Sequence, residues 1–212
     1  MYGGLEIKAI GQLGFFVIVL GVVQFFLLTF VAALLYPGGF DYFGYFFSDL
    51  GAVMAKNGEP NFASSALFSI AIVAVAVTLI PFWLVIRSLF VKSKLERILS
   101  MLGSVLGLIS FPFLIGVAVF PMDTQLGNHI LMTLIFFSLF VLATLIYSIV
   151  ALLNRDYPNC LGMIGLVLFG VSTLILVDPL ATYVAFLQTI VLYGYFVWVL
   201  LQTFFVRQQW KY

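Results

Sequence analysis

The sequence predicts an all-α integral membrane protein, built as a bundle of six transmembrane helices. Of its 212 residues, 64% are hydrophobic and only 8% are charged, whereas about a quarter of the residues in soluble domains are charged. Long apolar runs alternate with short polar segments, and a helix needs about 20 apolar residues to cross a membrane. We therefore expect one membrane domain over residues 1–212. The predicted spans are residues 13–35, 62–90, 98–120, 129–153, 160–177 and 179–206.

The first span follows a short polar start, residues 1–12. Its apolar run is longer than the roughly 7–15 residues of a signal peptide, so we interpret it as an anchor. The connection that follows, residues 36–61, is the longest in the chain, and residues 40–47 are almost entirely aromatic. Such side chains favour the headgroup region of a bilayer. This segment is expected to lie along the interface or to fold back as a re-entrant turn.

The second and third spans each contain a proline, Pro81 and Pro112, which predicts a kink in each helix. Ser93 and Glu96 have the spacing of a capping box and predict the start of the third helix. Small residues four apart on the third helix predict a face on which helix backbones approach closely in lipid. They are Ser100, Gly103, Ser104 and Gly107.

The remaining helix starts are predicted from polar residues before apolar runs. Asn128 and Asn159 are expected to cap the fourth and fifth spans, and Asp178 followed by Pro179 to cap the sixth. The single cysteine, Cys160, excludes an internal disulfide and a multi-thiolate metal site. We expect it to be a buried apolar thiol rather than a palmitoylation site.

The basic residues predict that both termini are cytoplasmic. With six spans, eight of the nine Lys and Arg residues fall on the side of the termini, and Lys56 alone falls on the other. By the positive-inside rule the basic side faces the cytoplasm. The expected location is therefore the cell membrane, with loop 36–61 outside.

Most of the distinctive polar chemistry lies in two stretches on that outer side, Phe47–Gly51 and Phe120–Asp123, with His129 just beyond. The candidate site residues are Ser48, Asp49, Asp123 and His129. Carboxylates with an imidazole would suit a divalent metal or an acid–base pair, and a serine beside a histidine would suit nucleophilic catalysis. No zincin spacing, nucleophile elbow or phosphate loop accompanies them.

Structural roles fit the same residues. His129 is suited to bonding a loop carbonyl, and Asp49 to holding loop 36–61 against the turn at Asp123.

No span carries an ionisable residue near its middle, which argues against a proton relay or a voltage sensor. Gln24 and Gln188 at mid-depth are expected to make interhelical hydrogen bonds. One histidine excludes bis-histidine haem ligation, and a net charge of +1 gives no basic field for nucleic acid.

The two polar stretches, with Asn61-Phe62 between them and His129 after them, resemble a known pattern. It is that of a prokaryotic six-span membrane family catalogued as domain of unknown function number 998. The family is distantly similar to damage-regulated autophagy modulator proteins. The resemblance covers nearly the whole chain and implies a six-helix fold. It directs attention to Ser48, Asp49, Asp123 and His129 but implies no activity.

Three functional hypotheses follow. The leading one is a non-enzymatic protein that interacts with membrane lipids, or an accessory subunit beside other membrane subunits, with no nucleic-acid partner and no cofactor. The second is an outward-facing lipid hydrolase or transferase, with Ser48 as nucleophile or with Asp49, Asp123 and His129 as acid–base groups or ligands of a divalent metal. The third is a small-molecule facilitator with a path opened at the proline kinks.

Overall fold

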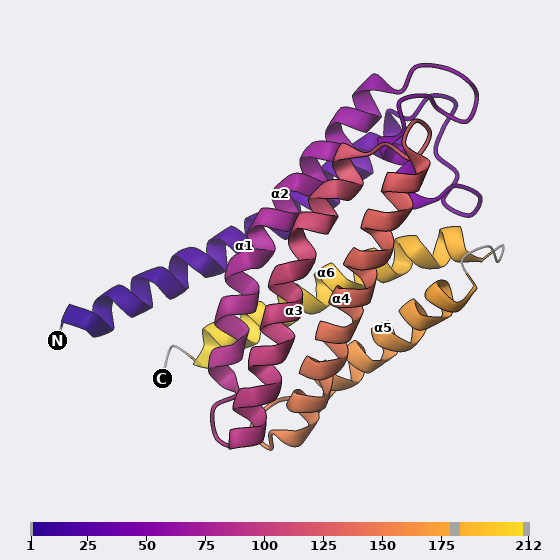
Figure 1. Ribbon diagram of the computed structural model, residues 1–212. Coiled ribbons are helices and arrows are strands. Elements are labelled where there is room, and N and C mark those ends of the chain that lie inside the picture. The colour runs from indigo at the N-terminus through magenta and orange to yellow at the C-terminus, as the bar shows by residue number, and fades with distance from the viewer. Residues whose placement is uncertain (1, 179–182, 210–212) are drawn as a thin grey trace.

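The computed structural model describes residues 2–178 and 183–209 as a bundle of helices (Figure 1). These helices are α1 (Tyr2–Leu34), α2 (Phe62–Ile86), α3 (Lys94–Val119), α4 (Leu126–Leu153), α5 (Asn159–Val177) and α6 (Val184–Gln209). Two short 3-10 helices, η1 (Phe47–Gly51) and η2 (Arg87–Leu89), lie in the first and second connections. In the described ranges, six helices are long and apolar enough to cross a membrane. The predicted all-α membrane fold is confirmed, and the chain is an integral membrane protein.

Neighbours in sequence are neighbours in the bundle. Each helix packs against the next, and α6 closes the arrangement by packing against α1 and α2. The connection between α1 and α2, residues 35–61, is called loop one below. Loop one and the α3–α4 turn share one end of the bundle, the loop-one end (Figure 1). The α2–α3 and α4–α5 connections lie at the opposite end.

The centre of the bundle is packed around large aromatic side chains, with small residues opposite them. Trp83 and Tyr147 are fully buried against α3. A Cβ atom added at Gly107 would lie 2.2 Å from the Trp83 ring, and one added at Gly103 would lie 2.8 Å from the Tyr147 ring. Ser104 Oγ lies 2.5 Å from the Trp83 carbonyl oxygen and 2.6 Å from the Tyr147 hydroxyl. The small face of α3 therefore makes room for the aromatic rings of α2 and α4, while the close approach of helix backbones stays a prediction.

The outward surface of the bundle is apolar, as the membrane interpretation requires. Leu20, Val77 and Val167 are examples of large apolar side chains that the bundle leaves exposed, an arrangement that soluble monomers avoid over large areas. Polar side chains instead bond inward. Gln24 Nε2 donates to the Ala71 carbonyl at 3.1 Å, which confirms the interhelical hydrogen bond predicted for this glutamine.

Several predicted helix starts were wrong. Helix α1 begins at Tyr2, ahead of its apolar span, whose bounds Gln12–Leu34 agree with the predicted residues 13–35. Helix α4 begins at Leu126 with Gln125 as its N-cap, and Asn128 bonds Gln125 from inside the first turn. Helix α5 begins at Asn159 itself, after Pro158. Sequence alone places a cap within a few residues because several polar residues at a turn compete for the position.

Other local predictions had mixed outcomes. Ser93 is the N-cap of α3 and accepts from the Glu96 N–H at 3.1 Å, but the Glu96 carboxylate accepts from Lys92 rather than from Ser93. Cys160 is exposed, so the prediction of a buried thiol was wrong. Asp178 is the C-cap of α5. Pro179, which was predicted to follow it at the start of the sixth helix, lies outside the described residues.

Candidate functional site

The site at the loop-one end is built around Asp49 in η1. The Asp49 Oδ2 atom accepts a hydrogen bond from the Phe46 N–H at 2.9 Å, and Oδ1 lies 2.9 Å from Lys56 Nζ. The Asp49 side chain is 4% exposed, whereas that of Lys56 is 44% exposed. A buried carboxylate is costly without partners. Here a backbone donor and a cation of the same loop supply them.

The first residues of α2 hold the other end of η1. Asn61, which is buried, donates from Nδ2 to the carbonyl oxygens of Leu50 and Ala52 at 3.0 and 2.9 Å. Ser64 Oγ donates to the same Leu50 oxygen at 3.0 Å. Carbonyl groups of a buried loop have no water to bond, so side chains must satisfy them. Loop one is thereby folded back onto the start of α2.

The α3–α4 turn holds loop one from the other side. The two carboxylate oxygens of Asp123 accept hydrogen bonds from the Val53 and Met54 N–H groups, at 3.0 and 2.9 Å. Ser48 Oγ donates to Met122 Sδ at 3.3 Å. The two polar stretches singled out in the sequence therefore meet. They meet at Ser48 and Met122, and the carboxylate that holds loop one to the turn is that of Asp123, not that of Asp49.

His129 joins the ends of α3 and α4. It is 5% exposed, and its Nδ1 atom lies 2.8 Å from the Phe120 carbonyl oxygen. A carbonyl oxygen can only accept, so Nδ1 carries a proton and donates it. The bond fixes the first turn of α4 against the end of α3, which is the loop-carbonyl contact that the sequence suggested.

The four candidate side chains thus have four separate sets of partners. Ser48 bonds a methionine sulfur, Asp49 a lysine, Asp123 two backbone amides and His129 a backbone carbonyl. Within the described parts of the chain, no three His, Cys, Asp or Glu side chains are grouped closely enough to hold a metal ion. A divalent metal at these residues remains a prediction. What the arrangement does chemically is to satisfy the polar groups of loop one.

Three partners in this arrangement were not assigned to it from the sequence. In the sequence, Lys56 was identified only as the single basic residue on the loop-one side. Its position among several carboxylates was the feature that could have predicted an ion pair. The Tyr36 hydroxyl accepts from the Lys56 N–H at 3.0 Å. Burial raises the pKa of Tyr36, so the hydroxyl stays protonated at neutral pH. Gln188 Oε1 accepts from the Phe47 N–H at 3.0 Å, which ties α6 to η1.

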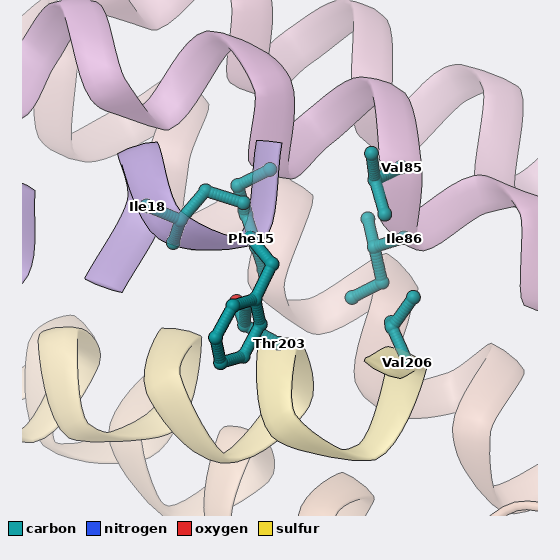
Figure 2. A pocket seen from close by; sticks show the side chains of 7 residues that line it. Phe15, Ile18, Val85, Ile86, Thr203 and Val206 are labelled. Atoms are coloured by element: carbon teal, nitrogen blue, oxygen red, sulfur yellow. The ribbon is translucent and has the colours of Figure 1, made fainter. Parts of the chain in front are cut away.

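A small enclosed pocket lies between α1, α2 and α6, away from this site (Figure 2). Its walls are almost wholly apolar, with Phe15, Ile18 and Val206 among them, and Thr203 contributes the one hydroxyl. Its volume is about 10 Å³, at the lower limit for a single water molecule. The pocket brings no set of chemical groups together.

Comparison with known proteins gives one match. Residues 19–204 match the model of a family described as "Protein of unknown function (DUF998)". No curated protein and no solved structure matches the chain significantly.

Proposed function

The chain belongs to the DUF998 family, and from this premise we propose that it is a non-enzymatic membrane protein that interacts with lipid through loop one. The observation that carries the proposal is that Ser48, Asp49, Asp123 and His129 each bond another group of the protein. A general base or a nucleophile must reach a substrate atom. Asp49 and Asp123 instead bond the backbone of loop one, Ser48 bonds the α3–α4 turn, and His129 holds the end of α3 to the start of α4.

The surface of loop one supports a lipid role. Tyr36, Phe40 and Tyr45 pack against one another edge to face or tilted, with ring centroids 5.4 to 5.9 Å apart. Phe43 is 69% exposed and stacks on Phe186 of α6, with centroids 4.7 Å apart and an interplanar angle of 15°. Aromatic side chains of this kind favour the headgroup level of a bilayer. Loop one is in this proposal a pre-organised aromatic surface for lipid.

We place loop one on the outer side of the cell membrane, with both termini in the cytoplasm. The support is the charge distribution: eight of the nine Lys and Arg residues belong to the other side of the bundle. The lipid that meets loop one would then be that of the outer leaflet.

Native mass spectrometry of the protein released from vesicles of phosphatidylethanolamine and phosphatidylglycerol tests the proposal. We expect bound phospholipid on the wild-type protein and less on Phe43→Ala. Phe62→Ala is the matched control, because Phe62 is 75% exposed at the same end of the bundle but lies outside loop one. The control should retain lipid as the wild type does.

A catalytic result would overturn the proposal. If the vesicles yield a lipid product, and that product disappears with a folded His129→Ala protein, the protein is an enzyme. Equal lipid retention by Phe43→Ala and the wild type would show that loop one is not the lipid contact. Co-isolation of a stoichiometric partner subunit covering Phe43 would have the same consequence.

A further inference from the structure

A groove runs between α1 and α6 directly below loop one. Phe26, Leu27 and Phe30 of α1 form one wall, and Phe186 of α6 lies opposite. The groove has a volume of about 480 Å³ and opens sideways from the bundle. This volume is within the range of about 300–1,000 Å³ that small-molecule sites occupy. Since its walls belong to membrane-spanning helices, the medium at its mouth is lipid rather than water.

The shape of the groove follows from the residues on α6. Thr189 is the smallest residue in the lining, and all the others except Leu27 are aromatic. Tyr193 stacks on Phe26 with ring centroids 5.2 Å apart and an interplanar angle of 25°. The stack of Phe43 on Phe186 adjoins the groove on its Phe186 side. Two stacked pairs therefore frame a gap that Thr189 leaves between α1 and α6.

The polar groups of the groove are few and arranged by depth. No charged side chain lines it. The Tyr193 hydroxyl lies 3.1 Å from Thr29 Oγ1, and Thr189 Oγ1 donates to the Ala185 carbonyl at 3.4 Å, so both hydroxyls already have partners. The third hydroxyl is that of Tyr42 in loop one, at the end of the groove nearest the membrane surface. Burial raises the pKa of Tyr42, so its hydroxyl remains a hydrogen-bond donor at neutral pH.

This order of polarity matches a phospholipid lying along the helices. An acyl chain carries no charge and needs apolar walls, and the ester and headgroup of the same molecule come next toward the surface. We propose that the groove between α1 and α6 binds one acyl chain of a membrane phospholipid, with the polar end of the lipid at Tyr42. The inference rests on the proposed lipid interaction, and it names the groove as the binding site and a phospholipid acyl chain as the ligand. Leu27 and Phe30, 59% and 55% exposed, form the open edge through which the chain enters from the bilayer.

Photo-crosslinking tests the site. The full-length protein is placed in vesicles of phosphatidylethanolamine and phosphatidylglycerol that contain a phospholipid with a diazirine in one acyl chain. After irradiation, the labelled peptides are identified by mass spectrometry. We expect labelling concentrated on residues 26–30 and 186–193, above that of the other lipid-facing helices.

Two variants fill the groove in different ways. Thr189→Trp fills it from α6, where the threonine is buried. Leu27→Trp fills it from the exposed edge, where the leucine is 59% exposed. Both should lose the concentrated labelling. Val167→Trp is the matched control, because Val167 is 62% exposed to lipid on α5, away from the groove. The control should label as the wild type does.

The outcomes separate this inference from the proposed function. Labelling spread evenly over all lipid-facing helices would overturn the groove site, while lipid retention that depends on Phe43 would leave the proposed function standing. Absence of labelling at residues 26–30 and 186–193 in protein that is dimeric in the vesicles would also overturn it, because a second copy of the chain would then occupy the groove. Labelling that persists in a folded Leu27→Trp protein would overturn it as well.

Discussion

The two ends of the bundle keep their connections in place by different means. At the loop-one end, the hydrogen bonds reach across the sequence: Asp123 bonds amides 69 and 70 residues away, and Gln188 bonds one 141 residues away. At the opposite end most of them are local. Ser93 caps the helix that follows it, and Asn154 Oδ1 accepts from the N–H two residues on. One end is a long loop held by other helices. The other is a pair of short loops held largely by their own residues and joined to each other by the Asn154–Glu96 hydrogen bond and the Lys92–Asp156 ion pair.

The difference follows from burial. Ser48, Asp49 and Asn61 are buried, so the loop backbone near them has to find donors and acceptors within the protein. At the opposite end, the ion pair of Lys92 with Asp156 is formed by side chains that are 61% and 68% exposed. Exposed charges gain little from pairing, because water solvates them in either state. Substitutions at the loop-one end should therefore be the more damaging ones.

The largest effect is expected for Asn61→Ala. It removes the buried hydrogen bonds to the Leu50 and Ala52 carbonyls; the Leu50 oxygen keeps the Ser64 hydroxyl, and the Ala52 oxygen loses its donor. Leaving one buried acceptor unpaired costs about 1–3 kcal/mol and losing a second hydrogen bond about 0.5–1.5 kcal/mol, so we expect a loss of about 2–4 kcal/mol in the free energy of unfolding in detergent. Asn57→Ala is the control, since Asn57 is exposed and bonds only the nearby Glu59 N–H. Equal losses in both variants would show that burial does not set the difference.

Asp123→Ala should release loop one from the α3–α4 turn. It removes both bonds to the Val53 and Met54 amides, at an expected cost of about 1–3 kcal/mol. Hydrogen exchange should accelerate at those two amides. Asp123→Asn retains one acceptor and should lie between the alanine variant and the wild type. Unchanged exchange in Asp123→Ala would mean that the turn does not hold the loop.

Ser93→Ala tests the opposite end. The N-cap bond to the Glu96 N–H is lost, and such caps are worth about 0.5–2 kcal/mol. The effect should stay confined to the first turn of α3 in hydrogen exchange, because the bond is local. Ser88→Ala is the control, since Ser88 is exposed and bonds only the Val85 carbonyl within its own turn. A loss of protection in loop one would contradict the independence of the two ends.

The smallest effect is expected where a lysine is removed from an exposed ion pair. Lys92→Met should cost no more than about 1 kcal/mol, and that loss should vanish at high salt. Lys56→Met removes the cation beside the buried Asp49 carboxylate and should cost more than Lys92→Met in the same measurement. If the two substitutions have the same effect at every salt concentration, the burial of Asp49 does not strengthen its pair.

Much of the site could be predicted from the sequence, but not its pairing. The two polar stretches were identified, their meeting was expected, and the contact of His129 with a loop carbonyl was among the alternatives. Asp49 was expected to face the Asp123 turn, but it pairs with Lys56 of its own loop. Which of two carboxylates meets which donor depends on how loop one turns back on itself, and no sequence period encodes that path.

The sequence by itself determined the class of protein and the number and order of its helices. Those depend on the length and composition of apolar runs, and a helix satisfies its own backbone within each run. It also determined the small face of α3, where Gly103 and Gly107 had to meet bulky neighbours. Only the tertiary structure decided the partners of Asp49, Asp123 and Gln188 and the groove beside Thr189. Those contacts join residues from different elements, and the packing of whole helices sets the distances between them.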